Sequence, residues 1–382
     1  MELMYLDHAA TTPLHPQVLE AMMPYLTENF GNPSSIHHFG RAARSAIHRS
    51  RDAMAELLGC HPSELIFTSG GTESNNAALF GVIFAEQDKP GKHVITTQME
   101  HHAILHPAEQ LEKLGVEVTY VPVDREGLVH PEHIEAAIRP GTVLISVMMV
   151  NNEVGTIQPI KEIGELARRH GIYIHVDAVQ ALGKLDLNLS EIPVDLMSFS
   201  GHKIYGPKGI GLLYAAKGTK FSPLLTGGAQ ERNKRAGTEH VAGIVGFAEA
   251  LKLISEKRAS FWSSCEDFRK VMTDHFLREL SSDGFVENGH SVQRVPHILN
   301  VSFPGMETET LLMDLDLEGI AASSGSACSS GSLELSHVLR AMDLPETVMG
   351  SAVRFSFGLG NSIENIHTAA QKTATIVKRI RK

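Results

Sequence analysis

Short apolar segments alternate with longer amphipathic segments over the first two-thirds of the chain. The short segments are rich in β-branched residues and nearly continuous in apolar character, as in strands buried on both faces of a sheet. The longer ones, such as residues 160–171 with Gly171 at the C-terminal end, have helical periodicity. This alternation predicts an α/β fold with a mostly parallel sheet that is covered by helices on both faces. The predicted strands are residues 64–69, 93–97, 116–123, 142–150, 172–179, 195–200 and 210–216.

The pattern changes after Gly237, and we expect a second, smaller domain there. A long helix is predicted from about Ala242 to Leu280. A chain of 382 residues is long enough for two domains. Further strands are predicted at 297–303, 320–325 and 352–357. The predicted division is an N-terminal segment that packs with the small domain (1–15), a large domain (16–250) and a small α+β domain (251–382).

Composition and charge exclude several classes of protein. The chain is 42% apolar and 20% charged, as in soluble globular enzymes, and its net charge of −10 disfavours non-specific binding to nucleic acid or anionic membranes. The N-terminus lacks the pattern of a signal peptide, and the longest apolar run, 143–150, is far shorter than the ~20 residues of a membrane span. Three widely spaced cysteines indicate a reducing compartment. We therefore expect a cytoplasmic protein with no membrane partner and no direct nucleic-acid partner.

Two motifs at the ends of predicted strands are suited to binding a phosphate and a heterocyclic ring. In FTSGGTESNN (67–76), Gly71 leads into a helix opened by Thr72, and the N–H groups at a helix N-terminus bind anions. In IHVDAVQALG, Asp177 ends a strand, where a carboxylate can hold a proton on a ring nitrogen, and Gln180 follows. On local grounds alone, an ordinary capped turn is the favoured explanation of the first motif, and helix capping explains the aspartate equally well.

The segment SGHKIYGPKG (200–209) places His202 and Lys203 after another predicted strand. A lysine beside glycines is most often a solvated residue on a surface turn, and Lys208 fits that description. However, a lysine, a phosphate cradle and a ring-nitrogen carboxylate at one sheet edge together form a site for pyridoxal 5'-phosphate (PLP), which binds lysine as a Schiff base. The combination favours Lys203 as that lysine.

Three further stretches carry reactive or charged side chains. In MEHHAIL, His101 either stacks on a cofactor ring or caps a helix. In SSGSACSSGS (323–332), serine and glycine surround Cys328, which suits an accessible nucleophilic thiol, although a Ser/Gly turn that contains a cysteine is the alternative. Arg354 lies in an apolar strand and needs a carboxylate, from a substrate or from an intramolecular Asp or Glu. No His/Cys cluster has metal-ligand spacing, so no metal is expected.

Together these segments resemble the cysteine desulfurases of the NifS/IscS type, class-V aminotransferase relatives within the fold-type I PLP enzymes. The resemblance implies a large domain with a mostly parallel seven-stranded sheet, a smaller α+β C-terminal domain, a homodimer and bound PLP. It also points to the subgroup whose reactive cysteine lies on a long loop. It covers nearly the whole chain, through YLDHAATTPL, GNPSSIHHFG, FTSGGTESNN, NNEVGTIQPI, HVDAVQALGK, SFSGHKIYGPKGIG, SSGSACSSGSLE and RFSFG.

The resemblance implies a role for each site residue. Lys203 would bind the cofactor covalently, His101 would stack on its ring and move protons, and Cys328 would accept the sulfur. Asp177 would hold the ring nitrogen and Gln180 the ring hydroxyl. The expected substrate contacts are Asn32, Asn152 and Arg354. The expected cofactor contacts are Gly71, Thr72, His101, Asn152, Asp177, Gln180, Ser200, His202, Lys203 and, from a second subunit, Thr238.

The implied reaction removes sulfur from L-cysteine, releases L-alanine and leaves a persulfide on Cys328 for an acceptor protein. The sequence ends at Lys382 without the longer C-terminal tail that members dedicated to iron–sulfur scaffolds often carry. A tRNA-thiolating enzyme is therefore as serious a candidate recipient as an iron–sulfur scaffold. Two alternatives are another fold-type I enzyme, such as a selenocysteine lyase or an aminotransferase, and a non-catalytic interaction protein that retains the fold.

Overall fold

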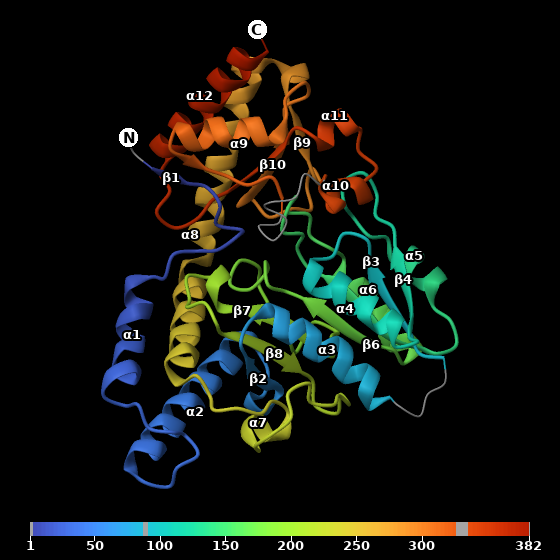
Figure 1. Cartoon of the computed structure of the whole chain (residues 1–382), viewed down its shortest axis with the longest axis vertical. Coiled ribbons are helices and arrows are strands. Elements are labelled where there is room, and N and C mark those ends of the chain that lie inside the picture. Colours follow the sequence, from blue (N-terminus) through green and yellow to red (C-terminus); the bar gives the residue numbers. More distant parts are fainter. Residues whose placement is uncertain (1–2, 87–90, 326–334, 382) are drawn as a thin grey trace.

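The computed structural model describes residues 3–86, 91–325 and 335–381, and within them seven strands form the central sheet (Figure 1). The strand order is β2-β8-β7-β6-β5-β3-β4, and all pairs are parallel except those that β8 makes with β7 and β2. The predicted α/β fold with a mostly parallel seven-stranded sheet is confirmed. The strands are β2 (Leu65–Thr68), β3 (His93–Thr97), β4 (Glu117–Val121), β5 (Thr142–Met148), β6 (Tyr173–Asp177), β7 (Leu196–Ser200) and β8 (Gly211–Ala215).

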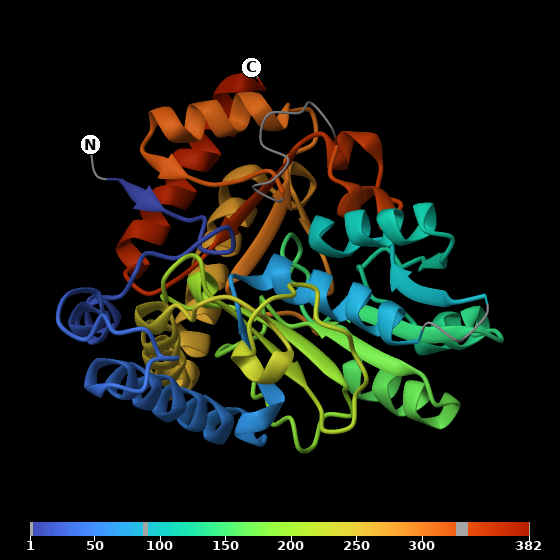
Figure 2. The same ribbon diagram turned by 60° about the horizontal axis from the view of Figure 1, so that its bottom comes forward.

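Helices cover both faces of this sheet, because successive strand residues point to opposite sides (Figure 2). In β7, Leu196 packs in one apolar cluster with α3 and α4, whereas Met197 and Phe199 pack in the other with α2, α6 and α8. Both faces of each central strand are therefore buried, which explains the near-continuous apolar runs. The helices are α2 (His38–Leu58), α3 (Gly71–Ala85), α4 (His102–Lys113), α6 (Ile160–His170) and α8 (Val241–Leu280).

The C-terminal part of the chain and the first residues together form a smaller α+β layer, at the top of Figure 1. β9 (Val286–Asn288), β10 (Ile298–Ser302) and β12 (Ala352–Ser356) form an antiparallel sheet, and β1 (Met4–Tyr5) pairs with β11 (Ile320–Ala321). The helices of this layer are α9 (Thr308–Leu317), α10 (His337–Ala341), α11 (Glu346–Met349) and α12 (Ile363–Ile380). The remaining elements are α1 (Pro16–Thr27), α5 (Pro131–Ala137), α7 (Gln230–Asn233), and the short 3-10 helices η1 (Pro62–Glu64), η2 (Gly201–Lys203) and η3 (Ser282–Gly284).

The helix α8 joins the two parts. It runs unbroken for 40 residues and packs against α1 and α2 at one end and α12 at the other. The domain boundary expected at residue 250 falls inside this helix, and the proposed division into domains stays a prediction. Despite the length of α8, the described part of the chain contains no helix that is both long and apolar enough to span a bilayer.

A buried histidine links three strands of the central sheet. Nδ1 of His175, in β6, hydrogen-bonds with Oγ of Ser146 in β5 at 2.8 Å, and Nε2 hydrogen-bonds with Oγ of Ser198 in β7 at 2.9 Å. Burial lowers the pKa of His175 to about 3. The ring is therefore neutral at neutral pH, and it ties together the strands whose ends carry the predicted site residues.

We expect acid to destabilise the fold through this residue. Unfolded, His175 takes up a proton near its ordinary pKa of 6.5, whereas in the folded chain it does so only near pH 3, so added protons favour unfolding. Its contribution is complete above about pH 6.5 and is lost towards pH 3, with a slope of at most ~1.4 kcal/mol per pH unit. Denaturant titrations between roughly pH 4 and 6 should give H175Q a shallower dependence of unfolding free energy on pH than the wild type; equal slopes would contradict this account.

Candidate active site

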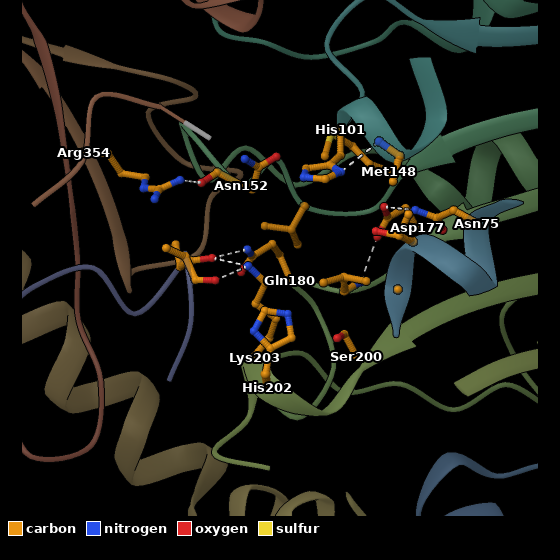
Figure 3. Close-up of a pocket in the computed structure, with 17 residues that line it drawn as sticks. Asn75, His101, Met148, Asn152, Asp177, Gln180, Ser200, His202, Lys203 and Arg354 are labelled. Atoms are coloured by element: carbon orange, nitrogen blue, oxygen red, sulfur yellow. Dashed lines mark hydrogen bonds between the residues drawn. The ribbon is translucent and has the colours of Figure 1, made fainter. Parts of the chain in front are cut away.

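A cavity of about 200 Å³ lies where the parallel strands end, beside the N-terminal segment, whose residues Ala9 and Ala10 line it (Figure 3). Among the predicted residues, Asn32 and Thr238 are exposed and do not line it. Cys328 lies outside the described residues. The predicted residues that line the cavity are Gly71, Thr72, His101, Asn152, Asp177, Gln180, Ser200, His202, Lys203 and Arg354.

Lys203 enters the cavity from η2, directly after β7. Its Nζ donates hydrogen bonds to the carbonyl oxygens of Ala9 and Ala10, each at 2.7 Å. These two acceptors belong to the N-terminal segment and were not predicted, because small residues in a loop give no signal of a backbone contact. They hold the amine at the cavity wall rather than in bulk solvent.

Asp177 lies at the end of β6 and is almost completely buried. Its Oδ1 accepts the N–H of Val179 at 3.0 Å, and its Oδ2 accepts Nδ2 of Asn75 at 2.7 Å. Burial raises the pKa of this carboxyl group. A buried carboxylate fixed by two donors is suited to bind a cationic ring N–H. Asn75 was missed, although it lies three residues after Thr72, on the same helix face.

His101 combines the two roles that the sequence left open. It is the N-cap of α4, where its Nδ1 accepts the N–H of Ala103 at 3.0 Å, and its ring also lines the cavity. Burial, with a further contribution from the charge of Lys203, lowers the pKa of His101 to about 4. The neutral ring that uses Nδ1 as an acceptor carries its proton on Nε2.

The N-terminus of α3 forms one wall of the cavity through Gly71 and Thr72. A Cβ atom at Gly71 would lie 2.7 Å from Cγ2 of Val179, so only glycine fits there without displacement. The nearby acid Glu73 is neutralised by Arg235, whose Nε and Nη2 bind its carboxylate at 2.8 and 3.1 Å. The helix end therefore remains suited to an anion.

Ser200, the last residue of β7, and His202, in η2, also line the cavity. Nδ1 of His202 hydrogen-bonds with Oγ1 of Thr11 at 3.1 Å. Burial, together with the charges of Lys203, Lys208 and Lys184, lowers the pKa of His202 to about 4, so the ring is neutral at neutral pH. The serine hydroxyl and the imidazole add side-chain donors to the backbone N–H groups of α3.

Arg354 lies on the opposite wall, and Figure 3 shows Asn152 between it and His101. Its Nη2 binds Oδ1 of Asp7 at 2.7 Å and its Nη1 binds the carbonyl of Asn152 at 2.9 Å. The intramolecular carboxylate that the sequence allowed is thus Asp7. Nε of Arg354 is buried and has no hydrogen-bond partner among the described residues, so the guanidinium retains capacity for another acceptor.

The residues on either side of the segment that contains Cys328 lie close to the carboxylate of Glu153. Oγ of Ser336 donates to Oε2 of Glu153 at 2.5 Å, and a Cβ atom at Gly325 would lie 3.0 Å from the same oxygen. Glu153 directly follows Asn152 of the cavity wall. The two cysteines with described surroundings, Cys60 and Cys265, do not line the cavity, and burial raises the pKa of each thiol to about 12.

The donor set fits PLP. A helix N-terminus with nearby hydroxyl and imidazole groups suits a phosphate, a buried carboxylate suits a pyridinium nitrogen, and a lysine amine suits an aldehyde. Within the ranges that the structure describes, no three His, Cys, Asp or Glu side chains form a group that could hold a metal ion. The fold and cavity define the class of PLP-dependent enzymes.

Comparison with known proteins gives the family. The model of the aminotransferase class-V family matches residues 4–368, and the chain belongs to this family. It is 50% identical to a cysteine desulfurase IscS of Dictyoglomus turgidum, over 99% of this chain and 95% of the relative. Two solved structures are each 36% identical: a NifS-like protein (TM-score 0.92, covering 99% of this chain and 100% of that chain) and SspA in complex with cysteine (TM-score 0.82, 93% and 98%). The predicted resemblance to cysteine desulfurases is confirmed.

We expect Gly71→Ala to weaken PLP binding at least about tenfold, because the new methyl group meets Val179 at 2.7 Å and displaces the helix N-terminus. The double variant G71A/V179A removes the opposing methyl group, after which the nearest side-chain atom is Cβ of Ser200 at 3.6 Å. It should recover much of the affinity. Fluorescence titration of the apoproteins with PLP measures both. Equal affinity in G71A and the wild type would argue against a phosphate site at this helix end.

Proposed function

We propose that this chain is a cysteine desulfurase, which uses PLP to remove sulfur from L-cysteine and passes it to Cys328. The observation that carries the proposal is that Lys203, Asp177 and Arg354 line one cavity. The 50% identity to a cysteine desulfurase supports the same reaction, as does the SspA structure in complex with cysteine.

In this proposal the phosphate binds at Gly71 and Thr72, joined by Ser200 and His202. Asp177 would hold the ring nitrogen, Gln180 would hold the ring hydroxyl, and Lys203 would bind the cofactor covalently. When bound, PLP supplies an electron sink that weakens the bonds to the substrate's α-carbon and activates its sulfur.

Arg354 and Asn152 bind the substrate carboxylate. The guanidinium offers planar pairs of N–H groups that match a carboxylate, and only one of its nitrogen atoms, Nη2, binds Asp7. Nε2 of His101 and Nζ of Lys203 lie on the walls of the same cavity, where they hold and return protons. Because the neutral His101 ring keeps its proton on Nε2, it donates a hydrogen bond into the cavity, and the amine of Lys203 takes up and returns the transferred proton.

The Cys328 thiolate attacks the substrate sulfur, so that a sulfur–sulfur bond forms as the carbon–sulfur bond breaks. The electron pair remains with the substrate carbon, which takes up a proton and leaves as alanine. Cys328 then carries a persulfide, whose outer sulfur passes to an acceptor protein. Both an iron–sulfur scaffold and a tRNA-thiolating enzyme are proposed recipients, and we propose the cytoplasm as the compartment.

We also propose a homodimer. Asn32 and Thr238 are exposed and lie outside the cavity of their own chain, which fits contacts made across a subunit interface. Large apolar side chains are exposed on α1 and on the residues that lead into α2, which supports burial there. They are Leu19, Met23, Leu26, Phe30, Ile36 and Phe39. Sedimentation of the holoenzyme tests this proposal, and a monomer with bound PLP would contradict it.

Mass spectrometry after incubation with L-cysteine tests the reaction. We expect one additional sulfur on Cys328, together with release of alanine. The variant C328A should retain the visible absorbance of the bound cofactor but lose both products, because only the acceptor thiol is missing. Undiminished alanine release from C328A would rule out the persulfide route, and K203A should lose the visible absorbance.

Variants of two neighbouring asparagines should affect substrate binding and stability differently. Asn152 lines the cavity, and N152A should raise KM for L-cysteine by about tenfold while the stability changes little. The side chain of Asn151 instead accepts the N–H groups of Glu153 and Val154 at 2.8 and 3.0 Å. N151A should lower the melting temperature, because it leaves buried N–H groups unpaired. A raised KM in N151A together with an unchanged KM in N152A would overturn the substrate role of Asn152.

A further inference from the structure

A second lysine, Lys184, is buried behind the cavity. Only 4% of its surface is exposed, and its Nζ donates a hydrogen bond to Oε1 of Gln180 at 3.3 Å. Among the described residues it forms no ion pair with a carboxylate. An unpaired buried ammonium group is unfavourable, so its presence beside a cavity residue calls for an explanation other than stability.

Lys184 is connected to Lys203 by a continuous chain of hydrogen bonds. Nε2 of Gln180 donates to the carbonyl oxygen of Ala9 at 2.9 Å, and Nζ of Lys203 donates to the same oxygen at 2.7 Å. Lys184 has only donors to offer, so the amide oxygen of Gln180 must face it. The amide NH₂ group of Gln180 is thereby turned towards Ala9 and the cavity.

In the part of the chain that the structure describes, other titratable groups surround Lys184, but none of them is a carboxylate paired with it. Burial lowers the pKa of Lys184 to about 7, the charge of Lys203 lowers it further, and Cys265 of α8 acts in the opposite direction. The facing imidazoles are His8 of the N-terminal segment, His202 of η2 and His297 next to β10. Burial lowers the pKa of all three, and the charge of Lys184 contributes. A proton on Lys184 therefore disfavours a proton on the groups around Lys203.

We propose that Lys184 is a positioning residue for the cofactor: it fixes the amide of Gln180 towards the ring hydroxyl, and its charge opposes protonation of the linkage between Lys203 and PLP. This inference rests on the proposed function, since it assumes that PLP binds Lys203. Cationic neighbours are a general means of keeping a reactive lysine nitrogen unprotonated.

The test compares holoenzymes of the wild type, K184M and K184Q by the pH dependence of the visible absorbance of bound PLP. We expect a shallow transition in the wild type, because two like charges titrate together. Both variants should give a steeper, one-proton transition, with the midpoint raised by roughly one pH unit. K208M is the matched control, because Lys208 is exposed and its charge also reaches His202, and it should leave the midpoint in place.

Measuring the PLP affinity of the two variants distinguishes the effect of the hydrogen bond from Lys184 to Gln180 from the effect of the Lys184 charge. K184M should bind PLP about tenfold more weakly, whereas K184Q, whose amide can still donate to Gln180, should stay near the wild type. Midpoints unchanged in both variants would overturn the electrostatic role, and full affinity in K184M would overturn the positioning role. If K184M does not fold, K184Q alone decides the electrostatic role and K184A replaces K184M in the affinity test. A wild type that shows no visible absorbance with added PLP would instead refute the proposed function.

Discussion

The cavity depends on the pairing of the N-terminal segment with β12. Asp7 forms a β-bridge with Ser356, and its carboxylate binds the buried guanidinium of Arg354. This pairing carries the segment across the ends of the parallel strands, where the carbonyl of Ala9 accepts hydrogen bonds from Lys203 and Gln180. Without it, Arg354 would be a buried charge with no carboxylate, and Lys203 would lose two acceptors. One long-range contact therefore both balances a charge and closes the site.

Strands and their ends could be predicted from the sequence because burial on both faces leaves a local pattern. The predicted strand at 142–150 ends earlier, at Met148, because Asn151 stabilises a turn through its side chain. The positions of Asp177 and Lys203 followed from the rule that parallel strands end at one edge. Contacts between distant segments, such as Asp7 with Arg354, leave no such pattern, and an apolar strand indicates only that its arginine needs some partner.

Burial determines the protonation state of several histidines in this fold. Burial lowers the pKa values of His175, His101 and His202; the first lies in the sheet interior, and the other two line the cavity. Each is neutral at neutral pH and offers one donor and one acceptor. The same imidazole therefore links strands in one place and lines a cavity in another, and sequence alone does not distinguish these positions among 21 histidines.

Oγ of Ser336 donates to the carboxylate of Glu153, and a Cβ atom at Gly325 would lie 3.0 Å from the same oxygen, so Gly325 and Ser336 lie close to one point of the framework. A connection that begins and ends at one anchor can be lengthened or shortened at little entropic expense, since closure entropy grows only slowly with length. Natural variation or engineering can therefore change the number of residues between Gly325 and Ser336 while the framework that holds Glu153 stays as it is.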